Sequence, residues 1–563
     1  MENVIVIIRR EDIPIATLIA KDLPSYRVYT FDPCMLDPII QSGFSNAEFI
    51  EWEKCPPHYD FDAEARRLAH EIQQKLDFSV REIIPGLTIK SWQHLNFYHT
   101  VSTLLWYSSL WKDVGLHFAG KKPYIFVCDT PGEYYLNSFL HSVLLMQYLH
   151  SNNIEFAAYA YPGPPDNGGL VPDLENFVLC EQRGQLLVHL PTCFYDIEYF
   201  QQEILATGRP LIAIKSRIHD LSFPGVSTVG LIDGELVLSN FPEVTNNTIS
   251  HYCQLLREAL IELLLPYMGY PHYLERLTDN FVKIYKSQLI TYFELNRYFG
   301  KNPPLRIILS DTSMGYHDPL VGFAEKFSIP VTLLPHAKTT FDIEHTYRNI
   351  TALSHPIQSH EICNGSGRVV FSQKIAYPEN FNGASITVSL RTISLLLNTL
   401  TLHGVYFSSI DPYFSGIRVL VEWCNQNDIV LKIRSRPDYL INELLITKSG
   451  IDPRLLIENR AESLEQHAQN CDLCLMYDQP TSASLYFLRN SIPVLNPIPE
   501  VLTPGELSIK NAILTPSESI ASTLQKLTRF KENSLSFTSF KEKQFRDYLV
   551  LFQNAQTLRR YLQ

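Results

Sequence analysis

Three small hydroxyl residues mark the start of a predicted helix near the end of the chain. The stretch 471–494, CDLCLMYDQPTSASLYFLRNSIPV, predicts a buried strand, a turn, a short helix and another strand. Thr481, Ser482, Ala483 and Ser484 lie where the helix begins. Free backbone N–H groups and the positive end of a helix favour an anion. The sequence therefore predicts a phosphate site, while a hydroxyl that only caps the helix would give the same pattern.

Two arginines alternate at the end of another predicted strand. They are Arg434 and Arg436 in LKIRSRPD, residues 431–438. Alternate residues of a strand point to the same face, and the guanidinium fork fits phosphate oxygens. We expect both arginines to bind a phosphate. Pairing with surface carboxylates is the alternative.

Three further strand ends carry groups that could move protons or bind charge. His336 directly follows the apolar run VTLLP, and a histidine there can act as an acid or base near neutral pH or have a purely structural role. Asp129 and Glu133 flank a predicted strand-to-helix turn, where a carboxylate could accept a proton from a hydroxyl or simply cap the helix. Asp311 follows the strand RIILS.

These residues need an α/β framework to hold them. Strand-like and helix-like stretches alternate over most of the chain, for example a strand–helix–strand unit at 305–336, and this alternation predicts parallel sheets with helices on both faces. The stretch RLLIEN at 454–459 is also predicted as a strand. In a parallel sheet, ligands bind beyond the carboxyl ends of the strands, where all the candidate residues lie.

Length and composition narrow the class of protein. The chain has 563 residues, too many for one core, with 45% hydrophobic residues and a net charge of −12. Without a basic stripe, broad nucleic-acid binding is not expected. Cys471 and Cys474 lack a second ligand pair, so we expect no zinc site and no metal. No signal peptide or membrane-spanning segment is predicted, which together with the scattered cysteines suggests a cytoplasmic protein.

The order of these motifs resembles a known family. A strand followed by His336, a strand ending in Arg-x-Arg-Pro, and the stretch PTSASLYFL…IPV are similar to glycosyltransferases of the two-Rossmann-domain (GT-B) architecture. The resemblance is to bacterial capsule, lipopolysaccharide and other surface-polysaccharide enzymes of the polysialyltransferase, Kdo-transferase and teichoic-acid-polymerase types. It covers mainly residues 305–500. Ala337 replaces a usual Gly, and Tyr486 replaces an acidic residue that often contacts the ribose.

The resemblance implies a fold, an activity and partners. It implies two Rossmann-like domains facing across a cleft: an acceptor-side domain at 1–350, a nucleotide-sugar domain at 351–540, and a final helix at 541–563 that packs back on the first. A CMP-, CDP- or UDP-linked sugar, with a CMP-linked acidic sugar as one candidate, would be transferred to a hydroxyl of a glycan or lipid-linked acceptor without metal or cofactor.

Roles and alternatives follow from the same resemblance. Asp129 or Glu133 would be the base, His336 would assist the leaving group, and the residues near 434 and 481 would bind the donor, with Asp311 beside them. A sugar-nucleotide epimerase or a non-catalytic nucleotide-sugar-binding subunit would fit the same frame. The tract at 526–546 mixes basic and aromatic residues, which fits peripheral membrane association or, more simply, a solvated helix face.

Overall fold

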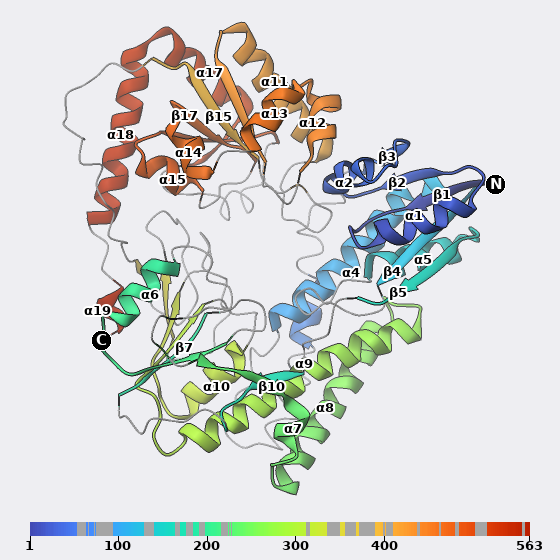
Figure 1. Ribbon diagram of the computed structural model, residues 1–563, viewed down its shortest axis with the longest axis vertical. Helices are drawn as coiled ribbons and strands as arrows, with labels where there is room; N and C mark the ends of the chain where they lie inside the picture. The colour runs from blue at the N-terminus through green and yellow to red at the C-terminus, as the bar shows by residue number, and fades with distance from the viewer. Residues whose placement is uncertain are drawn as a thin grey trace.

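The computed structural model describes most of the chain. The described residues are 1–52, 94–128, 140–163, 169–175, 184–190, 197–215, 228–310, 316–334, 350–354, 368–370, 389–397, 409–435, 440–460, 463–478, 483–500, 515–553 and 558–562, with isolated residues between 64 and 74 and at 223, 226 and 400. They form three parallel sheets with surrounding helices, drawn in blue, green to yellow, and orange to red in Figure 1. We call them the N-terminal, middle and C-terminal units.

The N-terminal unit is a five-stranded sheet in the order β3-β2-β1-β4-β5. All its neighbouring strands are parallel: β1 (Glu2–Val6), β2 (Arg27–Thr30), β3 (Ala47–Phe49), β4 (Lys121–Cys128) and β5 (Ala157–Tyr161). The accompanying helices are α1 (Asp12–Asp22), α2 (Leu36–Gln41), α4 (His94–Val114) and α5 (Leu140–Ser151). Strands this apolar are buried on both faces, as Val4, Ile5 and Val6 are, because helices cover both sides of the sheet.

The middle unit is a seven-stranded sheet in the order β14-β13-β12-β11-β7-β8-β9. Its parallel strands are β7 (Leu186–His189), β8 (Leu211–Ile214), β9 (Thr228–Val229), β11 (Arg306–Ser310), β12 (Val331–Leu334), β13 (Ile350–Ser354) and β14 (Arg368–Val370). Because the last two strands pair here, the sheet continues past residue 350.

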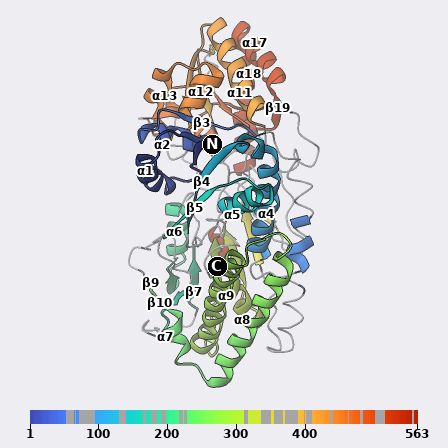
Figure 2. The same cartoon turned by 90° about the vertical axis from the view of Figure 1, so that its right-hand side faces the viewer.

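Helices and a small hairpin complete the middle unit. The helices are α6 (Ile197–Leu205), α7 (Gly234–Leu238), α8 (Glu243–Leu264), α9 (Pro271–Phe299) and α10 (His317–Lys326). The strands β6 (Leu170–Pro172) and β10 (Leu231–Asp233) form an antiparallel pair. Figures 1 and 2 place α7 at one end of the long axis and the C-terminal unit at the other.

The C-terminal unit is a five-stranded parallel sheet in the order β16-β15-β17-β18-β19. Its strands are β15 (Thr392–Leu396), β16 (Val430–Arg434), β17 (Leu473–Met476), β18 (Val494–Ile498) and β19 (Ser517–Ser519). Its helices are α11 (Ile410–Gln426), α12 (Asn442–Ser449), α13 (Pro453–Arg460), α14 (Leu464–Gln469), α15 (Ser484–Arg489), α17 (Ile520–Glu532) and α18 (Ser534–Gln553).

The α/β class with Rossmann-like parallel sheets is confirmed, and the structure adds a third sheet to the two expected. Counted along the chain, the strands of the N-terminal and middle units follow the Rossmann order, with strands 3-2-1-4-5 adjacent. The C-terminal unit follows the other doubly wound order, 2-1-3-4-5. In each case the order reverses at one point, between β1 and β4, between β7 and β11, and between β15 and β17.

One predicted strand is wrong. Residues 454–459, RLLIEN, belong to the helix α13. Pro453 occupies the first position of this helix, where its missing N–H has no cost and its fixed φ favours the helical turn. The strand β16 therefore remains the edge of its sheet.

The C-terminal end of the chain returns from the C-terminal unit and packs on the middle unit. After α18, the last helix, α19 (Arg559–Leu562), packs on α6 of the middle unit, where the Arg559 N–H donates to Glu203 Oε2 at 3.2 Å. Leu558 and Leu562 are fully buried in the same apolar cluster as Phe200 of α6. Both termini are marked in Figure 1. No helix in the described part of the chain has the length and apolar content to cross a membrane.

Candidate functional site

The C-terminal sheet brings three strand ends together at its carboxyl edge. Leu396 of β15 is in register with both Arg434 of β16 and Met476 of β17. The Leu397 N–H donates to the Arg434 carbonyl at 2.9 Å, which fixes the backbone on which this arginine is carried. The Arg434 side chain is half-buried at the sheet edge. Arg434 thus lies one strand away from the point, between β15 and β17, where the strand order reverses.

The turn after β17 is held in a strained conformation. Asp478 is fully buried and has a φ of 66°, in the left-handed region that non-glycine residues rarely adopt. Its N–H donates to the Pro497 carbonyl at 2.9 Å, and the Tyr477 hydroxyl donates to the Tyr413 carbonyl of α11. These bonds anchor the turn from which the predicted phosphate-binding segment starts.

The helix after this turn starts later than predicted. The helix α15 has six residues and begins at Ser484, with Ala483 before it and no side-chain cap. Ser484 is buried and Ala483 half-buried. Thr481 and Ser482 lie outside the described residues.

A carboxylate at this edge was not identified from the sequence. Glu500, two residues after β18, accepts a hydrogen bond from the Ser409 N–H at 2.9 Å, through Oε2. Ser409 is the N-cap of α11, so the chain's own carboxylate occupies the positive end of this helix. In the sequence, Glu500 could have been found as an acidic residue just after a predicted core strand, in IPVLNPIPE. The N-terminus of α11 is therefore already occupied by an acceptor from the chain itself.

The N-terminal sheet has a buried carboxylate at the reversal of its strand order. Asp12 follows β1 and accepts from the N–H groups of Ile8 and Arg9 at 3.0 and 2.8 Å, both through Oδ2, and from the Tyr161 hydroxyl at 2.9 Å through Oδ1. Burial raises the pKa of Asp12 to about 6, against the opposing effect of these hydrogen bonds. This carboxylate closes the turn between β1 and α1.

The carboxyl edge of the N-terminal sheet contacts that of the C-terminal sheet. Cys34, which follows β2, donates its thiol proton to the Leu400 carbonyl at 2.8 Å. Asp37 accepts from the Glu443 N–H of α12 at 3.4 Å. Segments that follow strands of two different sheets therefore meet directly, as Rossmann-like sheets do when they share a site.

Three of the predicted site residues lie in the part of the chain that the structure describes. Arg434, Ala483 and Ser484 are described and lie at the carboxyl edge of one sheet, as expected from parallel strands. The residues Asp129, Glu133, Asp311, His336, Arg436, Thr481 and Ser482 lie outside the described residues. Among the described residues no group of His, Cys, Asp or Glu could hold a metal ion, and Cys471 and Cys474 are buried.

Comparisons with known proteins give only structural likenesses. No family model matches the chain, and no curated protein matches its sequence. Solved structures similar to it include the Streptomyces sp. SF2575 glycosyltransferase SsfS6, complexed with thymidine diphosphate, at 10% identity and a TM-score of 0.32 over 68% of this chain and 98% of that one. MurG of Acinetobacter baumannii follows at 9% identity and 0.37, over 67% and 98% of the two chains.

A protein from Listeria monocytogenes described as a UDP-N-acetylglucosamine 2-epimerase is also similar, at 7% identity and a TM-score of 0.32 over 66% of this chain and 96% of that one. Identities and TM-scores this low do not transfer a function. We therefore argue function from the residues of this chain.

Proposed function

We propose that this chain is a glycosyltransferase that moves a sugar from a nucleotide-sugar donor to a hydroxyl of a surface glycan or lipid-linked acceptor. The observation that carries the proposal is the carboxyl edge of the C-terminal sheet. There Arg434 ends β16 in register with β15, one strand away from the reversal between β15 and β17, and doubly wound sheets bind nucleotides at such a reversal.

The donor phosphate would be held by fixed positive groups. Arg434, with Arg436 and the segment 481–484, would neutralise the charge that grows on the leaving nucleotide, and His336 would assist its departure. Because guanidinium groups can replace a cation in this role, we propose that transfer needs no metal. Closure of the units would exclude water and limit hydrolysis of the donor.

The acceptor hydroxyl would approach from the N-terminal side. Asp129 or Glu133 is the candidate base in this proposal, because Asp129 follows β4 at the reversal of the N-terminal sheet. Asp311, which directly follows β11 in the sequence, is proposed to act at the corresponding edge of the middle sheet. The contact between Cys34 and Leu400 supports a site shared between units, since it joins segments at two carboxyl edges.

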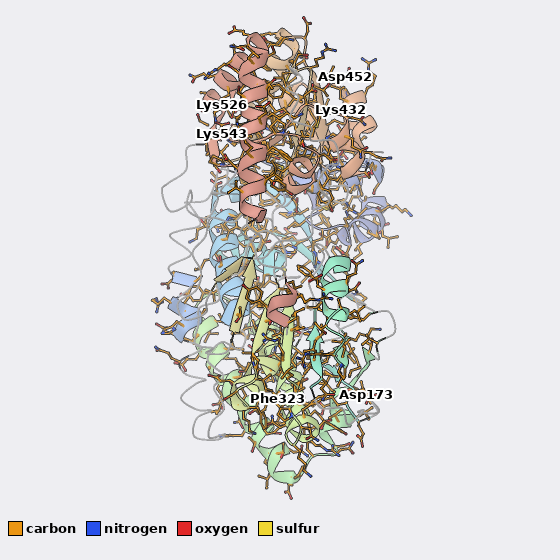
Figure 3. All side chains as sticks on the ribbon, turned by 90° about the vertical axis from the view of Figure 1, so that its left-hand side faces the viewer. Asp173, Phe323, Lys432, Asp452, Lys526 and Lys543 are labelled. Atoms are coloured by element: carbon orange, nitrogen blue, oxygen red, sulfur yellow. The ribbon has the colours of Figure 1, made fainter. Side chains whose placement is uncertain are left out.

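One feature supports a cytoplasmic location, and another bears on the proposed membrane contact. Cys34, Cys253, Cys424 and Cys474 are buried thiols that form no disulfide, as in a reducing compartment. In the tract 526–546, Lys526 already pairs with Glu518 at 2.5 Å, which favours a solvated face. Figure 3 shows Lys526 and Lys543 on the C-terminal unit, on the same unit as Lys432.

Nucleotide binding tests the proposal. We expect one of CMP, CDP, UDP or TDP to raise the melting temperature of the full chain, with Arg434→Ala weakening the shift. Lys543→Ala, an exposed basic residue of the same unit, is the control. If no nucleotide shifts the melting temperature, the proposal is wrong. Incubation with the donor alone then distinguishes an epimerase, which changes the sugar without an acceptor, from a transferase.

A further inference from the structure

The reversal of the middle sheet, between β7 and β11, carries two histidines that differ in their bonding. His189 ends β7 and is fully buried. Its Nε2 accepts from the Tyr316 N–H at 3.0 Å, and its Nδ1 lies 3.2 Å from the Ile214 carbonyl. Since an N–H can only donate and a carbonyl can only accept, His189 is neutral with its proton on Nδ1. Both of its nitrogens are used to tie β7 and β8 to the start of α10.

The second histidine, His317, directly follows Tyr316 and has one ring nitrogen without a hydrogen-bond partner among the described residues. His317 begins α10 and its side chain is 3% exposed. Its Nδ1 lies 3.5 Å from Asp318 Oδ1, a carboxylate that is 6% exposed. Its Nε2 is buried and has no hydrogen-bond partner in the part of the chain that the structure describes.

This arrangement selects one state of the ring. With Asp318 accepting from Nδ1–H, the lone pair of Nε2 is a free acceptor. An enclosed polar nitrogen without a partner destabilises the fold, and such groups in proteins call for an explanation. The described residues supply no donor for Nε2, so the position suits a donor that arrives with a ligand. It lies where doubly wound sheets bind ligands.

We propose that His317 is the catalytic base of the transfer, with Asp318 as its positioning residue. This inference rests on the proposed function and replaces Asp129 or Glu133 in the role of base. The ligand group that Nε2 receives is a hydroxyl of the acceptor. The hydrogen bond to Asp318 shortens as charge develops, because catalytic hydrogen bonds are often long in the free enzyme.

The step is balanced in atoms and electrons. The acceptor oxygen attacks the anomeric carbon of the donor, and the bond between that carbon and the phosphate oxygen breaks. The nucleotide leaves with the electron pair. The hydroxyl proton moves to His317 Nε2, and Asp318 stabilises the resulting imidazolium until the proton passes to solvent.

Substitution at His317 tests the base assignment. His317→Gln keeps a polar group of similar reach but cannot take a proton. With CMP-N-acetylneuraminic acid and UDP-N-acetylglucosamine as donor probes and water as the acceptor, we expect nucleotide release to fall at least 100-fold in kcat, from the usual contribution of a general base. The affinity for the nucleotide should stay within twofold. His251→Gln, an exposed histidine of α8, is the matched control and should leave both quantities unchanged.

A stability measurement separates catalysis from packing. Replacing His317 by Leu removes the unpartnered nitrogen, so the melting temperature should stay the same or rise while turnover is lost. Asp318→Ala should lower kcat without changing KM, and Asp318→Asn, whose amide oxygen can still accept from Nδ1–H, should recover part of the loss. Wild-type turnover in His317→Gln would overturn the assignment. If Asp129→Asn instead lost at least 100-fold in kcat while His317→Gln did not, the role of base would return to Asp129.

The two proposals fail in distinguishable ways. If the wild-type chain binds none of the nucleotides, the glycosyltransferase proposal fails before His317 is tested. If it binds a nucleotide and releases it from a donor at the same rate in the wild type and in His317→Gln, only the base assignment fails. That second result would mean that the enclosed nitrogen holds a buried water with a structural role.

Discussion

At the scale of single residues, Arg434 is the described side chain to which the proposed function assigns the largest part in donor binding. Its guanidinium sits at the end of β16, half-buried, with its backbone carbonyl bonded to the Leu397 N–H. A charged hydrogen bond to phosphate contributes about 1.5–3 kcal/mol, so Arg434→Ala should weaken donor use about tenfold or more. Steady-state nucleotide release as a function of donor concentration measures it. An Arg434→Ala enzyme with unchanged kcat/KM would remove the phosphate assignment.

Asp12 predicts a pH dependence of stability at the same scale. Burial raises the pKa of the folded carboxyl from 3.8 to about 6, so between these values the folded state holds the proton more tightly than the unfolded state. The free energy of unfolding should therefore fall as pH rises from 4 to 6, by up to about 3 kcal/mol, and level off above that.

Two substitutions on α1, Asp12→Asn and the control Asp22→Asn, test this pH dependence. Asp12→Asn should flatten the dependence, because an amide does not ionise and its oxygen can still accept from the N–H groups of Ile8 and Arg9. Asp22→Asn, at the exposed end of the helix, should keep it. Urea denaturation at pH 4, 5, 6 and 7 compares them. A slope that persists in Asp12→Asn would assign the effect to another group.

At the scale of elements, the packing of α11 against the strand ends depends on Gly416. A Cβ added there would collide with the Tyr477 hydroxyl and would lie 3.1 Å from Pro499 Cβ. In an open helix Gly→Ala stabilises by up to about 1 kcal/mol, but overpacking typically costs about 1–3 kcal/mol. The second effect is larger here because both neighbours are held by the sheet, so Gly416→Ala should lower the melting temperature.

A double mutant checks the cause of this loss. Tyr477→Phe removes the atom nearest the added methyl, so Gly416→Ala should be less costly in that background than in the wild type. Thermal unfolding of the four variants gives the coupling. Additive effects of the two substitutions would show that the collision with Tyr477 is not the reason.

At the scale of the whole molecule, the final helix holds the C-terminal end of the chain on the middle unit. Leu562 is fully buried in the cluster around α6. Truncation of a buried leucine costs about 2–5 kcal/mol, so Leu562→Ala should lower the melting temperature by several degrees. Leu535→Ala on α18, where the side chain is 64% exposed, should change it little. Equal melting temperatures for both variants would mean that α19 does not dock in solution.

The contacts between units differ in strength. Lys448 of α12 pairs with Glu51, but both side chains are partly exposed, and such pairs contribute about 0–1 kcal/mol. The Cys34 hydrogen bond is buried, so little water competes for it, whereas the Asp37 bond is part-buried and longer.

The sequence by itself determined the local elements and the edge on which the candidate residues lie. Short apolar runs such as VLKIR and LCLM form strands, whose backbone groups pair with the neighbouring strands, and a parallel sheet then places Arg434 and Ala483 at its carboxyl end. The strand predicted at 454–459 was wrong, because this short run belongs to a helix that begins at Pro453.

The tertiary structure decided the rest, because strand order, burial and long-range hydrogen bonds depend on residues far apart in the chain. It made three sheets, brought Glu500 to the N-terminus of α11 across 91 residues, and enclosed His317 beside Asp318 with one nitrogen unused. Whether a histidine is satisfied is a property of its surroundings, and no local pattern in the sequence encodes them.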